Sequence, residues 1–264
     1  MFDYHIHSDI SYDGNVPFLE LGRAAYLAGL AEICFTEHLD IPTDGNLADA
    51  VFDMGLYEAK FKAYQEIAPV PAKKGIEIGV YIEKIEDYLL FAEQHAFDFV
   101  ICSQHNVDNA DPYFIEFYDT HTTEETYSLY LKDMYASISA FKKYNVIGHL
   151  GYVCRYHDNL LKAPFDMKTY GDEIEAIFKM VIEEGKGVEL NTSYLNHPVG
   201  PNPPVDMLKR FREMGGEVIT TGSDAHTSQN VANAFPAAYA LLKEIGFKYV
   251  CTFENMNPIF HKLS

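Results

Sequence analysis

Short apolar runs separated by helical stretches recur along the whole chain. Residues 97–102 read Phe-Asp-Phe-Val-Ile-Cys, an apolar run of strand length. In residues 83–95, the side chains of Ile85, Tyr88 and Ala92 share one helical face. The pattern predicts strands over residues 2–7, 32–36, 76–82, 97–102, 146–147, 188–190 and 217–221, and helices over residues 17–29, 54–67, 83–95, 124–144, 171–184, around 207–211, and 230–245.

These strand-then-helix units contain no repeat, low-complexity tract or linker, so they predict one α/β barrel domain over residues 1–264. A barrel of this kind typically takes about 250 residues. Its chemistry lies on the face where the carboxyl ends of the strands emerge. Polar residues that directly follow the apolar runs are therefore the candidates for function.

Composition narrows the classes of partner. The formal net charge is −19, and no run of four or more basic residues is present. Nucleic acid is therefore not expected as a stable partner, because phosphate backbones are bound through clusters of Lys and Arg. The chain has no basic and apolar leader at its start and no apolar run of the ~18 residues that cross a membrane. We expect a cytoplasmic protein whose four scattered cysteines are free thiols.

Two pairs of candidate ligands stand at opposite ends of the sequence. His5 and His7 are two residues apart on a predicted strand, so both imidazoles leave the same face. Asp224 and His226 repeat this spacing after the last predicted strand. Each pair alone is modest evidence, but in a closed barrel the two would lie side by side and could bind one metal ion from rigid backbone.

Glu77 lies inside an apolar strand, between Ile76 and Ile78. A buried carboxylate is costly unless it is paired or binds a metal ion. The alternative to a ligand is an inward charge paired with Lys73, Lys74 or an arginine. As a ligand, Glu77 could bridge two ions with its two oxygens.

Three further histidines, His38, His105 and His149, each end an apolar run, where capping or core packing is the alternative to metal binding. Asp13 is either a turn-forming residue before Gly14 or a ligand. Imidazole and carboxylate oxygen are the ligands of hydrolytic zinc, manganese and iron sites, and nine of them suit a multinuclear centre. The candidate ligands are His5, His7, Asp13, His38, Glu77, His105, His149, Asp224 and His226. Glu37 would point away from His38 on a strand, which favours hydrogen-bond support over ligation.

The ordered segments HIHSDISYDG, TEH, GIEIG, CSQH, GHLG, ELNTS and GSDAH resemble the polymerase and histidinol phosphatase (PHP) superfamily over essentially the full chain. The resemblance is closest to the stand-alone histidinol-phosphatase branch. It implies a distorted, TIM-like (β/α)7 barrel that holds three divalent ions of zinc, manganese or iron at the strand C-terminal face. By this resemblance one ion would be held by His5, His7, Glu77 and Asp224, a second by Glu77, His105 and His149, and the third by Asp13, His38 and His226.

The resemblance also places Arg155 at a position that contacts phosphate in that branch. A guanidinium beside a carboxylate-rich site suits this role, because its planar donors match phosphate geometry. The alternative is a surface arginine paired with Asp158. Relatives often carry a second arginine after the NTS segment, but Asn196 stands there in this chain, and the neighbouring His197 is the candidate substitute for phosphate binding.

These features predict a metal-dependent phosphatase that hydrolyses a small phosphate monoester. By the resemblance, the expected reaction converts L-histidinol phosphate to L-histidinol and phosphate in histidine biosynthesis. Asp224 or His226 would assist proton transfer. The cationic end of the substrate would meet the loop at residues 106–121, where the candidates are Tyr113, Phe114, Glu116 and Tyr118.

Two alternatives remain open at this point. The enzyme could act on nucleotides or short oligonucleotides as a phosphatase or phosphodiesterase. The chain could also be a metal-holding, catalytically silent interaction module, although such a module would not need all nine ligand positions. The sequence leaves the oligomeric state open.

Overall fold

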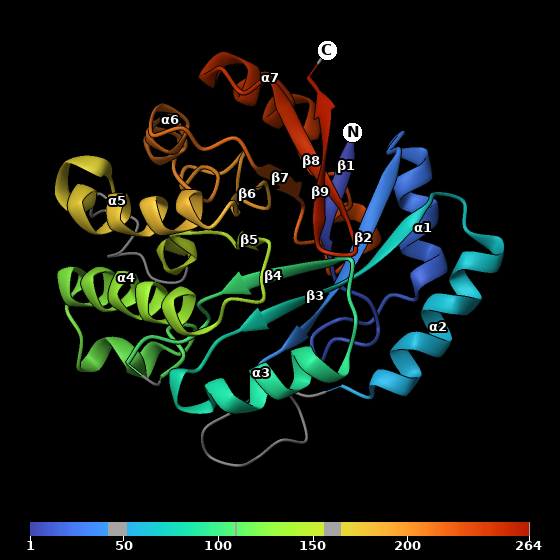
Figure 1. Ribbon diagram of the computed structural model, residues 1–264, viewed down its shortest axis with the longest axis horizontal. Helices are drawn as coiled ribbons and strands as arrows, with labels where there is room; N and C mark the ends of the chain where they lie inside the picture. Colours follow the sequence, from blue (N-terminus) through green and yellow to red (C-terminus); the bar gives the residue numbers. More distant parts are fainter. Residues whose placement is uncertain (42–51, 109, 156–164, 264) are drawn as a thin grey trace.

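Seven parallel strands form the centre of the computed structural model, which describes residues 1–41, 52–108, 110–155 and 165–263 (Figure 1). The strands follow one another in chain order, each paired with the next. Their bounds are β1 Phe2–Ile6, β2 Glu32–Leu39, β3 Ala72–Gly79, β4 Phe99–Ser103, β5 Val146–Ile147, β6 Gly187–Asn191 and β7 Ile219–Gly222.

Helices surround this sheet and cover its outer face (Figure 1). The α-helices are α1 Phe18–Leu27, α2 Met54–Ile67, α3 Ile85–Gln94, α4 Thr123–Ala140, α5 Met167–Glu183, α6 Val205–Glu213 and α7 Phe235–Ile245. Local chemistry sets several of their ends. Asp53 caps α2 through two backbone N–H groups, and Thr122 and Glu125 form a reciprocal capping box on α4.

The barrel is closed at the carboxyl ends of β1 and β7. The Asp224 N–H donates to the His5 carbonyl at 2.8 Å, and the His7 N–H donates to the Ala225 carbonyl at 2.9 Å. Ile6 and Ala225 form an isolated parallel bridge. The predicted (β/α)7 barrel is thus confirmed, and the first and last candidate ligand pairs lie beside each other.

A C-terminal hairpin was not predicted. Strands β8 Tyr249–Glu254 and β9 Asn257–Lys262 pair antiparallel after α7. Cys251 and Phe253 of β8 pack against Tyr4 and Phe99 at the amino ends of the barrel strands. The hairpin therefore closes the end of the barrel that lies opposite the candidate ligands.

Most predicted elements exist, but some boundaries were wrong. The helix predicted over residues 230–245 begins only at Phe235, because Ala232 and Ala234 have φ angles of 58° and 56°, outside the helical region. His261 of β9 is only partly exposed, and it forms a 2.7 Å hydrogen bond with Thr252 of β8. All four cysteines are buried free thiols, as expected. Among the described helices, none is long and apolar enough to cross a bilayer.

Candidate metal centre

The candidate ligands come from separate strand ends and meet at one place. His5 lies on β1 with His7 directly after it, and Glu77 lies near the end of β3. The register of β2 and β3 pairs His38 with Glu77. The other members follow β1, β4, β5 and β7 as loop residues: Asp13, His105, His149, Asp224 and His226.

The inner cluster consists of Glu77 and the imidazoles that face it: His5, His7, His105 and His149. Glu77 lies at its centre and is inaccessible to solvent. Its Oε1 lies 2.8 Å from His149 Nε2 and 3.2 Å from His105 Nε2. Its Oε2 lies 3.2 Å from His5 Nε2 and 3.5 Å from His7 Nε2. One carboxylate thus faces two sets of imidazoles with its two oxygens, which is the arrangement of a bridging ligand.

The alternative pairing of Glu77 with a lysine is wrong. Lys73 Nζ lies 3.1 Å from Glu254, and Lys74 Nζ lies 3.0 Å from Glu58, both on the outside of the barrel. The hydroxyl of Ser103 donates to Glu77 Oε1 at 2.6 Å and fixes its orientation.

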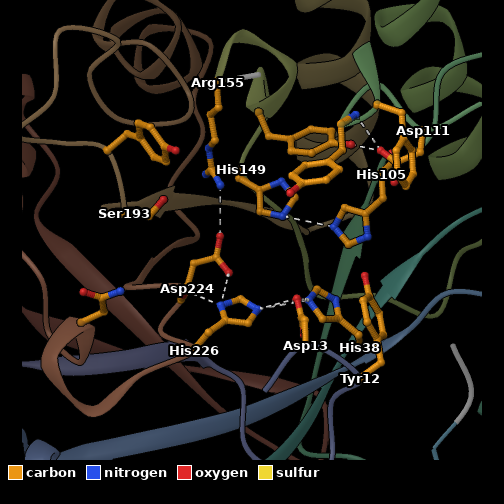
Figure 2. A pocket seen from close by; sticks show the side chains of 15 residues that line it. Tyr12, Asp13, His38, His105, Asp111, His149, Arg155, Ser193, Asp224 and His226 are labelled. Atoms are coloured by element: carbon orange, nitrogen blue, oxygen red, sulfur yellow. Dashed lines mark hydrogen bonds and ion pairs between the residues drawn. The ribbon is translucent and has the colours of Figure 1, made fainter. Parts of the chain in front are cut away.

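Asp224 connects the inner cluster to the cavity. Its Oδ1 lies 3.6 Å from His5 Nε2 and 3.5 Å from His7 Nε2, while its Oδ2 faces Arg155 (Figure 2). The residue adopts a φ angle of 57°, a conformation that a non-glycine residue rarely takes away from functional or tight-turn positions. This backbone turn directs the carboxylate back over β1.

The outer part of the cluster lies at the rim. Asp13 Oδ2 is 3.0 Å from His226 Nε2 and 3.5 Å from His38 Nε2, and these two Nε2 atoms are 3.4 Å apart (Figure 2). The Asp13 side chain is 38% exposed and that of His226 is 28% exposed, whereas His5 is fully buried. Asp13 therefore faces the other rim ligands rather than serving only a turn.

Several buried polar atoms in this cluster have no hydrogen-bond partner: His5 Nε2, His7 Nε2, His38 Nδ1, Glu77 Oε2 and His149 Nδ1. Unpaired buried polar atoms are costly and rare in proteins. Four groups of three ligand atoms each lie within 4.8 Å of one another: His7, His38 and His226; His5, Glu77 and His149; His5, His7 and Asp224; and His38, Glu77 and His105. Such donor sets fit divalent metal ions, which would coordinate the unpaired atoms that face one another, among them His5 Nε2, His7 Nε2 and Glu77 Oε2.

Neighbouring charges keep the carboxyl groups of Glu77 and Asp224 ionised, the form that binds metal cations. Burial raises the pKa of Glu77 and of Asp224, but the neighbouring imidazoles outweigh it and hold both pKa values well below the usual range. Burial would lower the pKa of His5, yet the carboxylates of Glu189 and Glu77 raise it well above normal. Burial and the adjacent imidazoles lower the pKa of His7. Metal binding would displace the His5 proton, since a ligating imidazole must be neutral.

Outer hydrogen bonds fix the direction of several imidazoles. His105 Nδ1 lies 2.7 Å from Asp40, and His5 Nδ1 lies 2.6 Å from Glu189. His7 Nδ1 lies 3.2 Å from the Ser11 hydroxyl, which itself donates to Glu37 at 2.6 Å. A partner on Nδ1 leaves Nε2 as the metal-facing nitrogen and orients the ring.

Glu37 thus gives the hydrogen-bond support expected of it, but Asp40 and Glu189 were missed by sequence reasoning. Each is an acid inside an apolar strand or at its end, the same signal that revealed Glu77. Both are buried, at 9% and 1% exposure.

A cavity of about 620 Å³ opens over the cluster. Its walls are Tyr12, Asp13, His38, His105, Asp111, Tyr113, Phe114, His149, Tyr152, Arg155, Ser193, Tyr194, Asp224, His226 and Asn230 (Figure 2). This size and the mixture of aromatic and polar walls suit a small-molecule ligand.

Arg155 is a wall of this cavity and not a surface residue. Its side chain is 7% exposed, and Nη1 lies 3.3 Å from Asp224 Oδ2. Nη2 donates to the Asn191 amide oxygen at 3.1 Å, and the guanidinium lies 5.0 Å from the centre of the Tyr194 ring. Asp158, the partner considered for a surface arginine, lies outside the described residues.

Of the other predicted substrate contacts, some line the cavity and others do not. Asn196 and His197 are exposed and are not among the cavity walls, while Ser193 and Tyr194 of the same segment are. In the loop after β4, Tyr113 and Phe114 line the cavity as predicted. Glu116 and Tyr118 do not, and Asp111 is the acid that faces the cavity in their place.

Comparison with known proteins agrees with this geometry. The PHP domain model matches residues 3–193. The histidinol-phosphatase of Lactococcus lactis subsp. lactis is 31% identical over 265 residues, covering 96% of this chain and 94% of the relative. A probable histidinol-phosphatase of Clostridium acetobutylicum is 28% identical over 255 residues, covering 95% of this chain and 96% of the relative.

A solved structure is similar over nearly the whole chain. The crystal structure of the Lactococcus lactis histidinol phosphate phosphatase, complexed with zinc, L-histidinol and phosphate, has a TM-score of 0.89 and 29% sequence identity, and the alignment covers 98% of each chain. The residues matched by the PHP domain model, 3–193, contain all of β1 but Phe2, the loops after β4 and β5, and Arg155. The chain therefore belongs to the PHP domain family.

Proposed function

We propose that this protein is a metal-dependent phosphatase that hydrolyses L-histidinol phosphate to L-histidinol and phosphate. The observation that carries the proposal is the convergence of eight imidazole and carboxylate side chains, with Asp13 at the rim, next to a buried arginine, in a fold similar to a phosphatase complexed with zinc, L-histidinol and phosphate. In this role the enzyme would supply L-histidinol for histidine biosynthesis.

The ligand groups support a divalent metal centre. We propose that it holds three ions, as the family resemblance implies, with zinc as the first choice because the similar structure contains it. The first ion would be held by His5, His7, Glu77 and Asp224, the second by Glu77, His105 and His149, and the third by Asp13, His38 and His226. Ions in such a centre supply a nucleophilic water at neutral pH and offset charge on phosphoryl oxygens.

The chain's own residues orient the phosphate. Arg155 approaches the cluster from the cavity wall, so its guanidinium can bind two phosphoryl oxygens and stabilise their charge in the transition state. Asp224 holds Nη1 of that guanidinium at 3.3 Å and keeps it aimed at the cluster. Asp224 and His226 both line the cavity beside Arg155, and we propose that one of them assists proton transfer when it is not coordinated to a metal ion.

The outer wall suits a substrate with a cationic end. Tyr12, Tyr113 and Phe114 line the cavity and are 59%, 65% and 58% exposed to solvent, and aromatic faces attract cations. Asp111 lines the same wall and accepts a hydrogen bond from the Tyr113 N–H at 2.8 Å. An ammonium or imidazolium group held there would point its phosphate toward Arg155.

The test is a kinetic comparison on protein of measured metal content. We expect kcat/KM for L-histidinol phosphate to exceed that for AMP and for p-nitrophenyl phosphate by about 10²-fold or more. Asp111→Asn should raise KM for L-histidinol phosphate while leaving KM for p-nitrophenyl phosphate unchanged, and Glu116→Gln, outside the cavity, is the matched control. Equal turnover of AMP and L-histidinol phosphate would favour the nucleotide alternative, and no turnover of any ester by metal-loaded protein would favour the silent module.

A further inference from the structure

Glu189 is a buried acid that the proposed chemistry does not use directly. It lies in β6 with its side chain 1% exposed. Its Oε1 lies 2.6 Å from His5 Nδ1, and its Oε2 accepts from the His149 backbone N–H at 2.8 Å and from the Asn191 side-chain amide at 3.3 Å. One carboxylate thus contacts β1, the loop after β5 and the end of β6.

The neighbouring strand leaves room for this carboxylate. A Cβ on Gly222 of β7 would lie 2.1 Å from Glu189 Oε1 and 2.5 Å from the His5 Cβ. Gly222 is not among the glycines with positive φ, so the absent side chain provides space rather than backbone freedom. The fold therefore makes a dedicated place for Glu189 against His5.

The contacts of Glu189 continue to the phosphate side of the cavity. Asn191 donates to Glu189 Oε2 and to Asp224 Oδ2, both at 3.3 Å, and its oxygen accepts from Arg155 Nη2 at 3.1 Å. Besides the contact of Asp224 with both residues, a hydrogen-bonded path from His5 Nδ1 to the Arg155 guanidinium therefore passes through two side chains, Glu189 and Asn191. Both groups at its ends need fixed directions, since a metal ligand and a phosphate clamp lose function when misplaced by about 1 Å.

We propose that Glu189 is a positioning residue that orients His5 for metal binding and, through Asn191, holds Arg155 in place for the phosphate. The inference rests on the proposed function for the identity of the phosphate ester, but not for the binding of zinc or of inorganic phosphate. Asp40 is the natural comparison. Its Oδ1 lies 2.7 Å from His105 Nδ1, so it also orients a ligand, but among the described residues its side chain contacts His105 and His38 and not Asn191 or Arg155.

Glu189→Gln disrupts the hydrogen bonds of Glu189 to His5, His149 and Asn191 without changing the size of the side chain. If the amide oxygen faces His5, the NH2 group faces the two N–H donors of His149 and Asn191. If the NH2 group faces His5, Nδ1 must accept and the ring proton moves to Nε2, which then cannot bind a metal ion. Each orientation of glutamine therefore loses one side of the network.

The experiment measures zinc affinity by competition with a chromophoric chelator, and inorganic phosphate affinity by calorimetry on zinc-saturated protein. Glu189→Gln should weaken zinc binding about 10- to 100-fold, the usual effect of removing such a partner, and should also weaken phosphate binding. Asp40→Asn should weaken zinc binding but leave phosphate binding as in the wild type. Asn191→Ala should weaken phosphate binding more than zinc binding.

Circular dichroism and thermal unfolding confirm that each variant is folded. Wild-type zinc affinity in Glu189→Gln, or a loss of phosphate affinity no larger than that in Asp40→Asn, would overturn the inference. Neither measurement uses L-histidinol phosphate. A failure of the proposed substrate in the kinetic comparison would therefore be distinguishable from a failure of the role of Glu189.

Discussion

The two halves of the barrel interior differ in how their buried groups are satisfied. At the amino ends of the strands, Tyr4, Phe99, Ile101 and Val146 pack with Phe253 of the C-terminal hairpin. The Tyr4 hydroxyl there contacts Glu32 and also accepts from the Phe253 N–H at 3.1 Å. At the carboxyl ends, the interior consists of imidazoles and carboxylates, several of whose polar atoms have no partner.

This difference indicates that one end of the barrel stabilises the fold and the other end binds metal ions. Aromatic and aliphatic packing at the closed end stabilises the fold, because it removes apolar surface from water. The open end buries imidazole and carboxylate atoms without hydrogen-bond partners, which costs free energy until cations bind. Changes at the two ends should therefore have separable effects, one on metal binding and turnover and the other on the free energy of unfolding.

The largest effect is expected at the open end, from Glu77→Gln. The variant loses the carboxylate that faces both sets of imidazoles, so we expect it to lose at least one metal ion per chain. Turnover should fall by about 10³-fold or more, since metal ions supply several kcal/mol of transition-state stabilisation. Elemental analysis and kcat measure the two effects. Wild-type metal content in a variant with the native circular dichroism spectrum would show that Glu77 is not a shared ligand.

At the closed end, Phe253→Ala should destabilise the protein by about 3–5 kcal/mol, the usual result of emptying a buried aromatic site. Its ring is 2% exposed and lies 4.9 Å from the Phe99 ring. Zinc affinity and KM should stay at wild-type values under conditions where the variant is folded. Urea unfolding measures the change, with Phe260→Ala, which is 45% exposed on β9, as control. A large loss of zinc affinity in Phe253→Ala would contradict the separation of the two ends.

A smaller effect at the open end is expected from Arg155→Lys. Lysine keeps the charge but cannot offer two parallel donors to phosphate, so KM for the phosphate ester should rise about tenfold, while the free energy of unfolding changes little. The control is Arg210→Lys on α6, where the guanidinium pairs with Glu175 at the surface. An unchanged KM in Arg155→Lys would remove Arg155 from phosphate binding.

The sequence was more informative about the open end than about the closed end. His5, Glu77 and His149 could be found because polar residues that interrupt or end apolar runs are unusual. The hairpin that contains Phe253 was missed although residues 249–253 read Tyr-Val-Cys-Thr-Phe, a strand-like run followed by a turn with Asn255. An antiparallel pair after the seventh helix has no place in a barrel of strand-then-helix units, so the prediction stopped at that helix. The sequence also does not predict the path of the loop after β6. Asn196 could therefore not be distinguished from Tyr194, which lines the cavity.

An effect as small as that of Arg155→Lys is expected at the closed end, from the pH dependence of Lys186. Its ammonium precedes β6, donates to the Lys142 carbonyl and lies 3.7 Å from the centre of the Tyr144 ring. Burial, helped by the nearby charge of Lys142, lowers the pKa of Lys186 from 10.5 to about 8. Between these pH values the unfolded chain binds a proton that the folded protein does not, so the contribution of Lys186 to stability rises with pH.

Lys186→Met removes this titration, while background titrations cancel in the difference between the two proteins. The free energy of unfolding of the wild type, minus that of Lys186→Met, should therefore increase from pH 8 to pH 10.5 by about 1–2 kcal/mol after allowance for solvent screening. Urea unfolding of metal-free protein measures it, with Lys179→Met, exposed on α5, as a control with a flat difference. If the difference in the free energy of unfolding is also independent of pH for Lys186→Met, solvent reaches this ammonium. The closed end would then be more hydrated than its packing indicates.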